Sequence, residues 1–433
     1  MAKTIRLLLL IGLLITAFIA IEAQAASSRI NVLHVEGTIN PVLVDYIERG
    51  FAQAEEENAI ACVIQMDTPG GLDTSMRLII QSILNAKVPV VVYIPSGARA
   101  ASAGFFITIA AHVAVMAPGT EIGAAHPVAM SAEGEAAMSE AMQAKIVNDA
   151  AAYAISIANT HGRNTEWAEK AVREAASLPA HQALELNVID MIAPNLDSLI
   201  SQLDGWQVTM LDGSVVTLHT KGATVNHVYM NIVEDFLYTI ADPNIAYILL
   251  SLAMLGIMVE IFNPGLIFPG VVGGICGLLA FYSLGMLPVN YAGVLLIVLA
   301  FCLFIAEVFT TTFGLFTAGG LTSLVIGSLI LFKGGPVFQI SPWLIATVSI
   351  CIAALFAFVI NRVIKAHRHQ ATTGREELAG KTAIVKVALE PEGTVLFKGE
   401  RWTAISEKGR VEPGEDVIIT KVDGLTLYVT KKE

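Results

Sequence analysis

Two short glycine-containing segments carry the residue types needed for acyl transfer. The first is Asp67-Thr68-Pro69-Gly70-Gly71, and the second extends from Ser96 to Gly104 and places Ser102 among alanines. Paired glycines let backbone N–H groups converge with no side chain between them. A serine just before a helix is held firmly, and the helix N-terminus favours a negative charge beside it. The two segments therefore predict a nucleophilic Ser102 next to donors for an oxyanion.

A purely structural role for Ser102 is the alternative. Serine is a favoured helix N-cap, and the run Phe105–Ala111 that follows it has a helical pattern. A cap would use the hydroxyl to bind the backbone of that helix. The upstream Gly70-Gly71 pair favours the nucleophile, because a cap needs no such segment.

A nucleophilic serine needs a base that takes its proton, and Lys145 is the first candidate. The predicted helix around Lys145 has small residues on the same face: Ala141, Ala144, Asn148 and Ala152. Such a face predicts a closely packed amine that has lost its water. Desolvation lowers the pKa of an amine, so Lys145 could accept the serine proton near neutral pH. A lysine on the solvent-exposed surface is the alternative.

His126 competes with Lys145 for the role of base. It lies in Gly123-Ala124-Ala125-His126-Pro127, beyond another strand-like run, and could belong to a catalytic triad. Arg99, next to the nucleophile segment, either assists substrate binding or faces solvent.

The elements that must position these residues alternate between strand and helix. Strand patterns at Asn31–Val35, Ile60–Met66 and Val88–Ile94 are separated by helix patterns at about 42–57 and 73–85. Strands that are apolar on both faces and joined by helices predict a parallel sheet covered by helices. Both glycine segments follow strands, at the edge where such folds place their sites.

The composition predicts a membrane protein. The 433 residues are 55% hydrophobic and 15% charged, against about 25% charged in ordinary globular proteins. Between residues 243 and 361 only Glu260, Glu307 and Lys333 are charged. This pattern excludes a cytosolic soluble enzyme, a disordered chain and a basic nucleic-acid-binding protein.

The apolar block divides into about five segments, each near the ~20 residues that cross a bilayer. They are Ile245–Phe262, Leu266–Leu287, Ala292–Phe309, Phe313–Phe332 and Pro342–Asn361. The glycine-rich second segment could instead be re-entrant, which would leave four crossings.

The N-terminus has the three-part pattern of a signal peptide over residues 1–25. Lys3 and Arg6 precede an apolar run, and Ala23-Gln24-Ala25 has the small residues of a cleavage site. An uncleaved anchor is the alternative. In either case residues 26–235 are expected to be exported.

The basic residues after the last span set the remaining topology. Arg362, Lys365 and Arg368 mark the cytoplasmic side of the membrane. An exported N-terminal domain then requires an odd number of crossings, which five spans satisfy and four do not. We therefore expect a multi-pass inner (plasma) membrane protein whose C-terminal domain is cytoplasmic.

The C-terminal region, residues 374–433, turns polar. Five short alternating runs separated by Gly/Pro turns predict a small β-barrel of the OB type. OB folds often bind single-stranded nucleic acid through a basic groove. Here 10 Lys+Arg stand against 11 Asp+Glu over residues 371–433. This balance favours a protein-docking module, and no nucleic-acid partner is predicted.

The motifs together resemble the long form of the NfeD family of membrane-bound serine peptidases. The resemblance rests on Asp67–Gly71, the element around Ser102 and Ala117-Pro118-Gly119-Thr120-x-Ile122-Gly123, in that order. It extends to Gly399-Glu400-x-Trp402-x-Ala404 near the C-terminus. The family is similar in fold to the Clp protease proteolytic subunit and to signal peptide peptidase A. The resemblance thus implies an α/β Clp/crotonase-like exported domain, a multi-span helical membrane region and an all-β OB domain.

The resemblance also implies roles for single residues. Ser102 matches the nucleophile, and Lys145 in Lys-Ile-x-Asn matches the general base. Gly71 and Ala103 match the backbone N–H donors of the oxyanion hole, with Gly70 and Asn148 in support.

His126 matches the base position of Clp proteases, but the matching acid position holds Ala175. A triad would therefore lack its orienting carboxylate, although the neighbouring Glu174 keeps that alternative open. The Ser–Lys dyad is the preferred hypothesis.

The predicted function is a membrane-anchored serine endopeptidase that cleaves apolar segments. The resemblance implies a stomatin-like membrane protein as substrate or partner, and a homo-oligomer is expected. No metal, nucleotide or other cofactor motif is found. The alternative function is a non-catalytic scaffold that organises stomatin-like assemblies through the OB domain. An acyl-CoA enzyme sharing the fold is disfavoured, because an exported domain would not meet coenzyme A.

Overall fold

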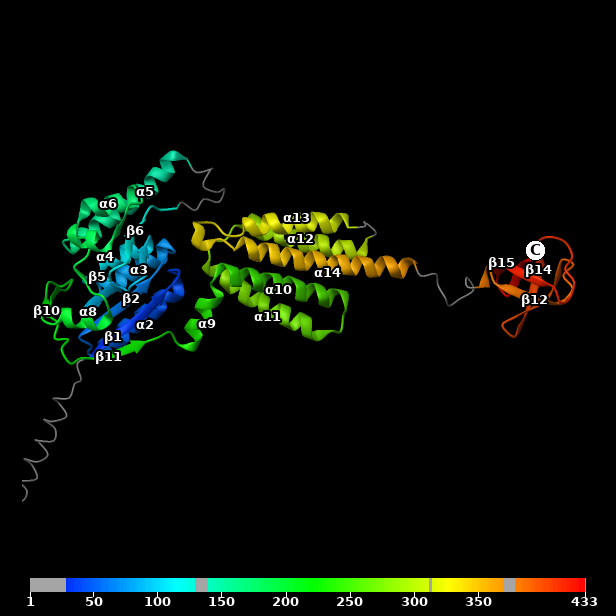
Figure 1. The fold of residues 1–433 in the computed structure, drawn as a ribbon, viewed down its shortest axis with the longest axis horizontal. Helices are drawn as coiled ribbons and strands as arrows, with labels where there is room; N and C mark the ends of the chain where they lie inside the picture. Colours follow the sequence, from blue (N-terminus) through cyan, green and yellow to red (C-terminus); the bar gives the residue numbers. More distant parts are fainter. Residues whose placement is uncertain (1–28, 129–138, 311–313, 369–377, 433) are drawn as a thin grey trace, which may run out of the picture. The chain divides into compact units, whose positions relative to one another are not determined.

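The computed structural model describes residues 29–128, 139–310, 314–368 and 378–432 (Figure 1). The predicted signal peptide, residues 1–25, lies outside the described residues. The chain forms two compact units, of which the larger extends to Ile350 and the smaller contains the C-terminal barrel. Each unit is described by itself.

A six-stranded parallel sheet forms the centre of the N-terminal domain, in the order β11-β1-β2-β3-β5-β8. Its strands are β1 (Arg29–Glu36), β2 (Ala61–Asp67), β3 (Val90–Ile94), β5 (Val113–Met116), β8 (Met191–Ile192) and β11 (Thr224–Val228). All five residues of β3 are buried, as expected for a strand covered on both faces. The predicted parallel α/β sheet is confirmed.

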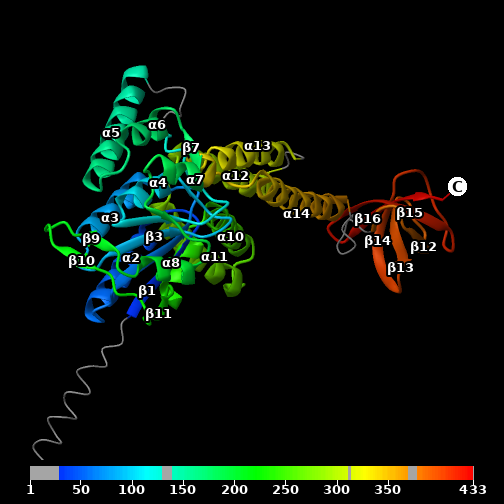
Figure 2. The same ribbon diagram turned by 60° about the vertical axis from the view of Figure 1, so that its left-hand side comes forward.

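Alternate residues of the strands build two separate cores. Leu33, Ile64 and Val92 face helices α2 (Pro41–Glu56), α3 (Asp73–Leu84) and α4 (Ala103–Ala110). Val32, Val63 and Val91 face the opposite layer. That layer consists of helix α8 (Leu196–Leu203) and the hairpin of β9 (Gln207–Thr209) and β10 (Val215–Thr217), which are labelled in Figure 2.

A second, smaller sheet lies where the central strands end. It contains β4 (Arg99–Ala101), β6 (Glu121–Gly123) and β7 (Ser177–Pro179). The remaining helices of the domain are α5 (Glu140–Thr160), α6 (Thr165–Arg173), α7 (Ala180–Glu185) and α9 (Ile232–Ile240).

The apolar block is helical and follows the five predicted segments. The helices are α10 (Pro243–Phe262), α11 (Ile267–Met286), α12 (Tyr291–Phe309), α13 (Leu315–Leu329) and α14 (Pro342–Arg368). By length and composition α10, α11 and α12 can each cross a membrane, whereas α13 and the apolar part of α14 are shorter. The buried carboxylate of Glu307 accepts a hydrogen bond from Thr317 N at 2.9 Å, so it holds the start of α13.

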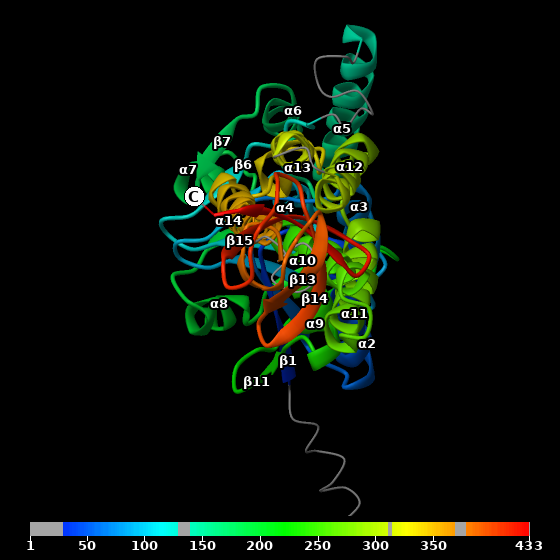
Figure 3. The same ribbon diagram turned by 90° about the vertical axis from the view of Figure 1, so that its right-hand side faces the viewer.

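The C-terminal region is a closed five-stranded barrel in the order β12-β13-β14-β16-β15 (Figure 3). Its strands are β12 (Thr382–Val387), β13 (Glu392–Phe397), β14 (Glu400–Ser406), β15 (Asp416–Asp423) and β16 (Thr426–Lys431). Small and branched side chains such as Ala404, Val417 and Val429 fill its core. The predicted small all-β barrel is confirmed.

Candidate active site

Three sequence motifs that are distant along the chain meet beside Ser102. Thr68 N donates a hydrogen bond to Arg99 O at 2.9 Å, and Ala101 N donates to Thr68 O at 3.1 Å. Ser102 N donates to Gly123 O at 2.9 Å, which joins the third motif to the nucleophile. The site therefore lies at the carboxyl ends of β2, β3 and β5, the edge predicted from the strand pattern.

The backbone at Ser102 is strained. Its φ of 52° and ψ of −112° lie outside the regions that L-residues prefer. Strain of this kind costs about 1–3 kcal/mol and persists only where the surroundings enforce it. Ser102 precedes α4, yet its side chain forms no cap hydrogen bond with that helix. The N-cap alternative is therefore not what the hydroxyl does in this structure.

Gly70 lies directly against the nucleophile. It has a φ of +120°, and a Cβ added there would lie 2.8 Å from Ser102 Cβ and 3.1 Å from Ser102 Oγ. Thr68, fully buried, fixes this turn because its Oγ1 accepts a hydrogen bond from Gly70 N at 3.0 Å. Thr68 is a positioning residue that the sequence reasoning missed, although it lies within the quoted motif.

The two predicted oxyanion donors flank the contact between Gly70 and Ser102, since Gly71 follows Gly70 and Ala103 follows Ser102 in the chain. Gly71 is paired with Ile39 in a parallel bridge, whose two hydrogen bonds use Gly70 O and Leu72 N. The N–H of Gly71 itself therefore points away from Ile39. Ala103 is the first residue of α4, so its N–H has no acceptor within the helix. Neither N–H donates a hydrogen bond to any residue that the structure describes. One predicted oxyanion donor thus belongs to the loop after β2 and the other to the first residue of α4, and the two segments meet at the contact between Gly70 and Ser102.

The predicted packing of Lys145 is wrong for the single chain. Lys145 is exposed, as are Ala141, Ala144 and Asn148 on the same side of α5. The reason is that α5 packs onto the domain through its second half, where Ala150, Ala151, Ala154, Ile157 and Ala158 are buried. The structure therefore does not bring the Lys145 amine into contact with Ser102, and it does not strip that amine of water.

His126 and Asn148 are engaged elsewhere. His126 Nδ1 lies 2.9 Å from Val172 O, where a protonated nitrogen donates to the carbonyl. In the described part of the chain, no hydrogen bond joins His126 to Ser102 or to a carboxylate. Asn148 Oδ1 accepts a hydrogen bond from Arg173 Nη1 at 2.7 Å, which ties the exposed half of α5 to α6.

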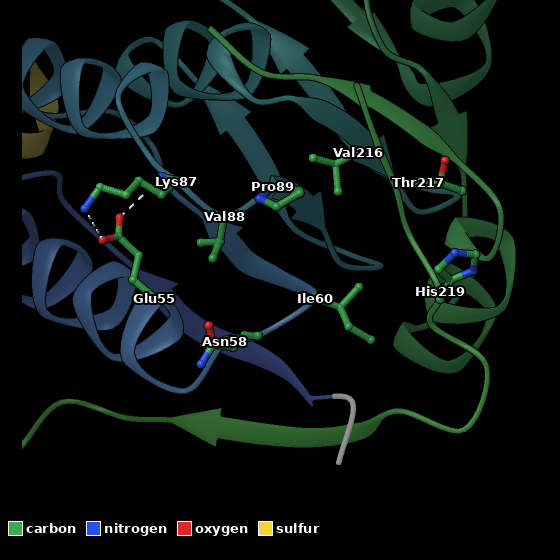
Figure 4. Close-up of a pocket in the computed structure, with 10 residues that line it drawn as sticks. Glu55, Asn58, Ile60, Lys87, Val88, Pro89, Val216, Thr217 and His219 are labelled. Atoms are coloured by element: carbon green, nitrogen blue, oxygen red, sulfur yellow. Dashed lines mark hydrogen bonds and ion pairs between the residues drawn. The ribbon is translucent and has the colours of Figure 1, made fainter. Parts of the chain in front are cut away.

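A cavity of about 540 Å³ lies at the opposite edge of the sheet (Figure 4). Ile60 and Val88 line it just before β2 and β3 begin, and Lys87 forms an ion pair with Glu55 beside them. It is therefore remote from Ser102. Over the ranges that the structure describes, no three His, Cys, Asp or Glu side chains gather in a way that could hold a metal.

Family models match three successive regions of the chain. They are the NfeD1b N-terminal domain over residues 29–210, the NfeD integral membrane domain over 244–362 and the NfeD-like C-terminal, partner-binding domain over 375–431.

Two relatives match almost the whole length. The membrane-bound protease PH1510 of Pyrococcus horikoshii is 37% identical over 434 residues, which cover 98% of each chain. Membrane protein NfeD1b of Bacillus subtilis is 28% identical over 97% of each chain. Among solved structures, the 1510-N membrane-bound stomatin-specific protease, as a lysine-to-alanine variant in complex with a substrate peptide, is 32% identical. That match covers 50% of this chain and 98% of the other, with a TM-score of 0.46.

The resemblance that the motifs indicated is thus confirmed over the whole protein. With 37% identity to one relative across 98% of its length, and with three successive regions matched by models of the same family, the chain belongs to the NfeD family of membrane proteins.

Proposed function

We propose that this NfeD-family protein is a membrane-bound serine endopeptidase. The observation that carries the proposal is a strained serine whose hydroxyl does not cap α4, placed where two segments meet whose Gly71 and Ala103 N–H groups donate to no residue that the structure describes. Ser102 Oγ attacks the scissile carbonyl carbon, and the Gly71 and Ala103 N–H groups stabilise the oxyanion. The amine product leaves with a proton, and water then hydrolyses the acyl-serine ester to regenerate the hydroxyl.

We assign the role of general base to Lys145. The family resemblance supports this assignment, and no carboxylate of the described residues forms a hydrogen bond with His126 that would orient it. Separate variants distinguish the two bases: Lys145→Ala should abolish peptide cleavage, whereas His126→Ala should leave it within a few-fold of wild type. Full activity of Lys145→Ala together with loss in His126→Ala would contradict the dyad.

Lys145 can act as a base near neutral pH only if another surface excludes water from its amine. We propose that a second copy of the chain supplies this surface. The face of α5 around Lys145 is exposed and lined by small side chains, Ala141 and Ala144 among them, which allow close approach of another backbone. An Ala144→Glu variant should therefore lose both self-association and cleavage. Light scattering of the purified protein measures the first and peptide hydrolysis the second. An Ala152→Glu variant, on the same helix and also exposed, tests whether the effect is confined to the turns beside Lys145.

The proposed substrate is an apolar segment of a stomatin-like membrane protein. The relative from Pyrococcus horikoshii is named a membrane-bound protease, and the 1510-N protease domain is described as stomatin-specific. The C-terminal barrel, which matches a partner-binding family model, is the proposed docking module for the same protein.

The proposed topology places residues 26–235 outside the inner membrane and the barrel in the cytoplasm, with the helices embedded in the lipid bilayer. The predicted export of the N-terminal domain, the apolar helices and the basic residues in the last turns of α14 support it. Cysteine variants at Arg29 and Lys398 test it with a membrane-impermeant maleimide applied to intact cells. Only the first site should react, and the reverse result would overturn the topology.

A non-catalytic scaffold is the second candidate, and the exposure of Lys145 to solvent favours it. Labelling with a fluorophosphonate decides between the two, because that reagent phosphonylates an activated serine, whose oxygen displaces fluoride from phosphorus. The peptidase predicts a labelled wild type and an unlabelled Ser102→Ala variant. If the wild-type protein is never labelled and cleaves no apolar peptide, the peptidase proposal is refuted and the scaffold is the function that remains.

A further inference from the structure

The helix that leads into the first membrane span contacts a loop of the N-terminal domain through one tyrosine. Tyr238 on α9 donates a hydrogen bond from Oη to Glu36 O at 2.7 Å, and Thr38 O lies 3.3 Å from the same oxygen. Gly37 lies between these two carbonyls with a φ of +94°. A Cβ added to Gly37 would lie 2.6 Å from Tyr238 Oη, so only glycine leaves room for the hydroxyl.

The loop that Tyr238 holds, residues 36–40, is bonded to the segment that carries the oxyanion donor. Gly37 N donates to Asp67 O, Ile39 N donates to Gly70 O, and Leu72 N donates to Ile39 O, each at 2.9 Å. Two of these bonds involve the residues immediately before and after Gly71. The position of the Gly71 N–H therefore depends directly on the position of Ile39.

Helix α9 is itself firmly placed. The Arg49 guanidinium forms two hydrogen bonds with the Glu234 carboxylate, both at 2.7 Å, and Arg49 Nη2 donates to Tyr229 O at 2.9 Å. A capping box between Asn231 and Glu234 fixes the first turn of the helix. Burial raises the pKa of Tyr238 to about 12, so its hydroxyl keeps its proton and remains a donor.

We propose that Tyr238 is a positioning residue of the active site, which aligns the Gly71 N–H for the oxyanion by fixing residues 36–40 from the membrane-proximal helix. The proposal rests on the proposed function. The Tyr238 hydroxyl lies against the carbonyls of Glu36 and Thr38, so its effect on the site passes through the backbone of Ile39. Such an effect should appear only where negative charge develops on the carbonyl oxygen.

A Tyr238→Phe variant of the full-length protein in detergent or nanodiscs tests the proposal. It keeps the ring and removes the donor. Loss of one complete oxyanion donor costs about 10²–10³-fold in kcat, and loss of alignment alone should cost less, about tenfold. We expect that decrease in kcat with KM unchanged. We also expect weaker binding of a peptide boronate, which forms a tetrahedral adduct with the serine, by about the same factor.

The affinity for an uncleaved peptide distinguishes a positioning role from a merely structural one. A structural defect would weaken the binding of the peptide and of the boronate alike, whereas a positioning defect would weaken only that of the boronate. In the Ser102→Ala background, Tyr238→Phe should leave the affinity for the peptide substrate unchanged, because ground-state binding does not use the oxyanion donor. An equal loss of peptide and boronate affinity would overturn the proposal.

Tyr46 provides a matched control. Its hydroxyl donates to Val228 O at 2.6 Å and accepts from His34 N at 2.8 Å, in the same domain but away from the Gly71 segment. Tyr46→Phe should reduce thermal stability to a similar extent as Tyr238→Phe and leave kcat unchanged. If Tyr46→Phe and Tyr238→Phe have the same kcat, the inference is refuted. The proposed function still stands in that case, provided that the wild type reacts with the fluorophosphonate and cleaves peptide. A wild type without serine reactivity would overturn the proposed function and this inference with it.

Discussion

Replacing Gly70 with alanine separates the placement of the nucleophile from the stability of the fold. The new Cβ would lie 2.8 Å from Ser102 Cβ, about 0.6 Å closer than the 3.4 Å at which ordinary contact begins. Both atoms belong to backbone-anchored positions, so the clash cannot be relieved by a flexible side chain. Either Ser102 or the 67–72 segment must move by roughly that amount.

The size of the effect follows from two separate costs. A side chain at a φ of +120° costs about 1–2 kcal/mol of folding free energy, whatever surrounds it. A displacement of about 1 Å can reduce a reaction rate about 10²-fold, so a shift of roughly half that distance should reduce serine acylation by at least about tenfold. The expected result is a folded protein that reacts slowly.

Gly97→Ala is the matched control for this substitution. Gly97 has a φ of +84° in the turn before β4, and a Cβ added there would meet nothing within 4 Å. Both variants should lose similar stability in thermal denaturation, but only Gly70→Ala should show slower fluorophosphonate labelling and peptide cleavage. Wild-type labelling of Gly70→Ala, or equal slowing of both variants, would refute the idea that this contact sets the position of Ser102.

Two further predictions concern the stability of the N-terminal domain. Asp190→Asn should lower the free energy of unfolding by about 3–5 kcal/mol, because it leaves the 5%-exposed Arg163, now 2.5 Å from Asp190 Oδ2, as an unpaired buried charge. Arg77→Gln breaks exposed ion pairs with Asp73 and Asp149 and removes the guanidinium that lies 4.4 Å from the centre of the Tyr153 ring, so it should cost about 1–2 kcal/mol in the same denaturant titration. Stability should also fall with acid, because burial and the nearby Arg163 lower the pKa of His112 to about 4 and that of His161 to about 3. The unfolded chain protonates both rings below pH about 6.5, so each contributes a loss of about 1.4 kcal/mol per pH unit from there down to its folded pKa. His161→Gln should roughly halve that slope in denaturation curves measured between pH 6 and 4.5, and an unchanged slope would assign the acid sensitivity to other groups.

The sequence alone determines the order of the elements and the nucleophile segment. A run such as Val90–Ile94, apolar at every position, requires cover on both faces, and the chain supplies helices between such runs. The placement of Ser102 between a strand and a helix follows from the same local pattern. The five strands of the barrel likewise follow from alternation and turn residues, which act over a few neighbours.

Only the tertiary structure decides which side of a helix is covered and which loops touch. An alanine face around Lys145 has the composition of a packed surface, but α5 reaches the domain with its later turns, so that face is exposed in one chain. The contact of Gly70 with Ser102, and that of Tyr238 with residues 36–40, join positions far apart along the chain. Local periodicity specifies what each segment can form, whereas such contacts depend on how the whole set of helices and strands packs around two cores.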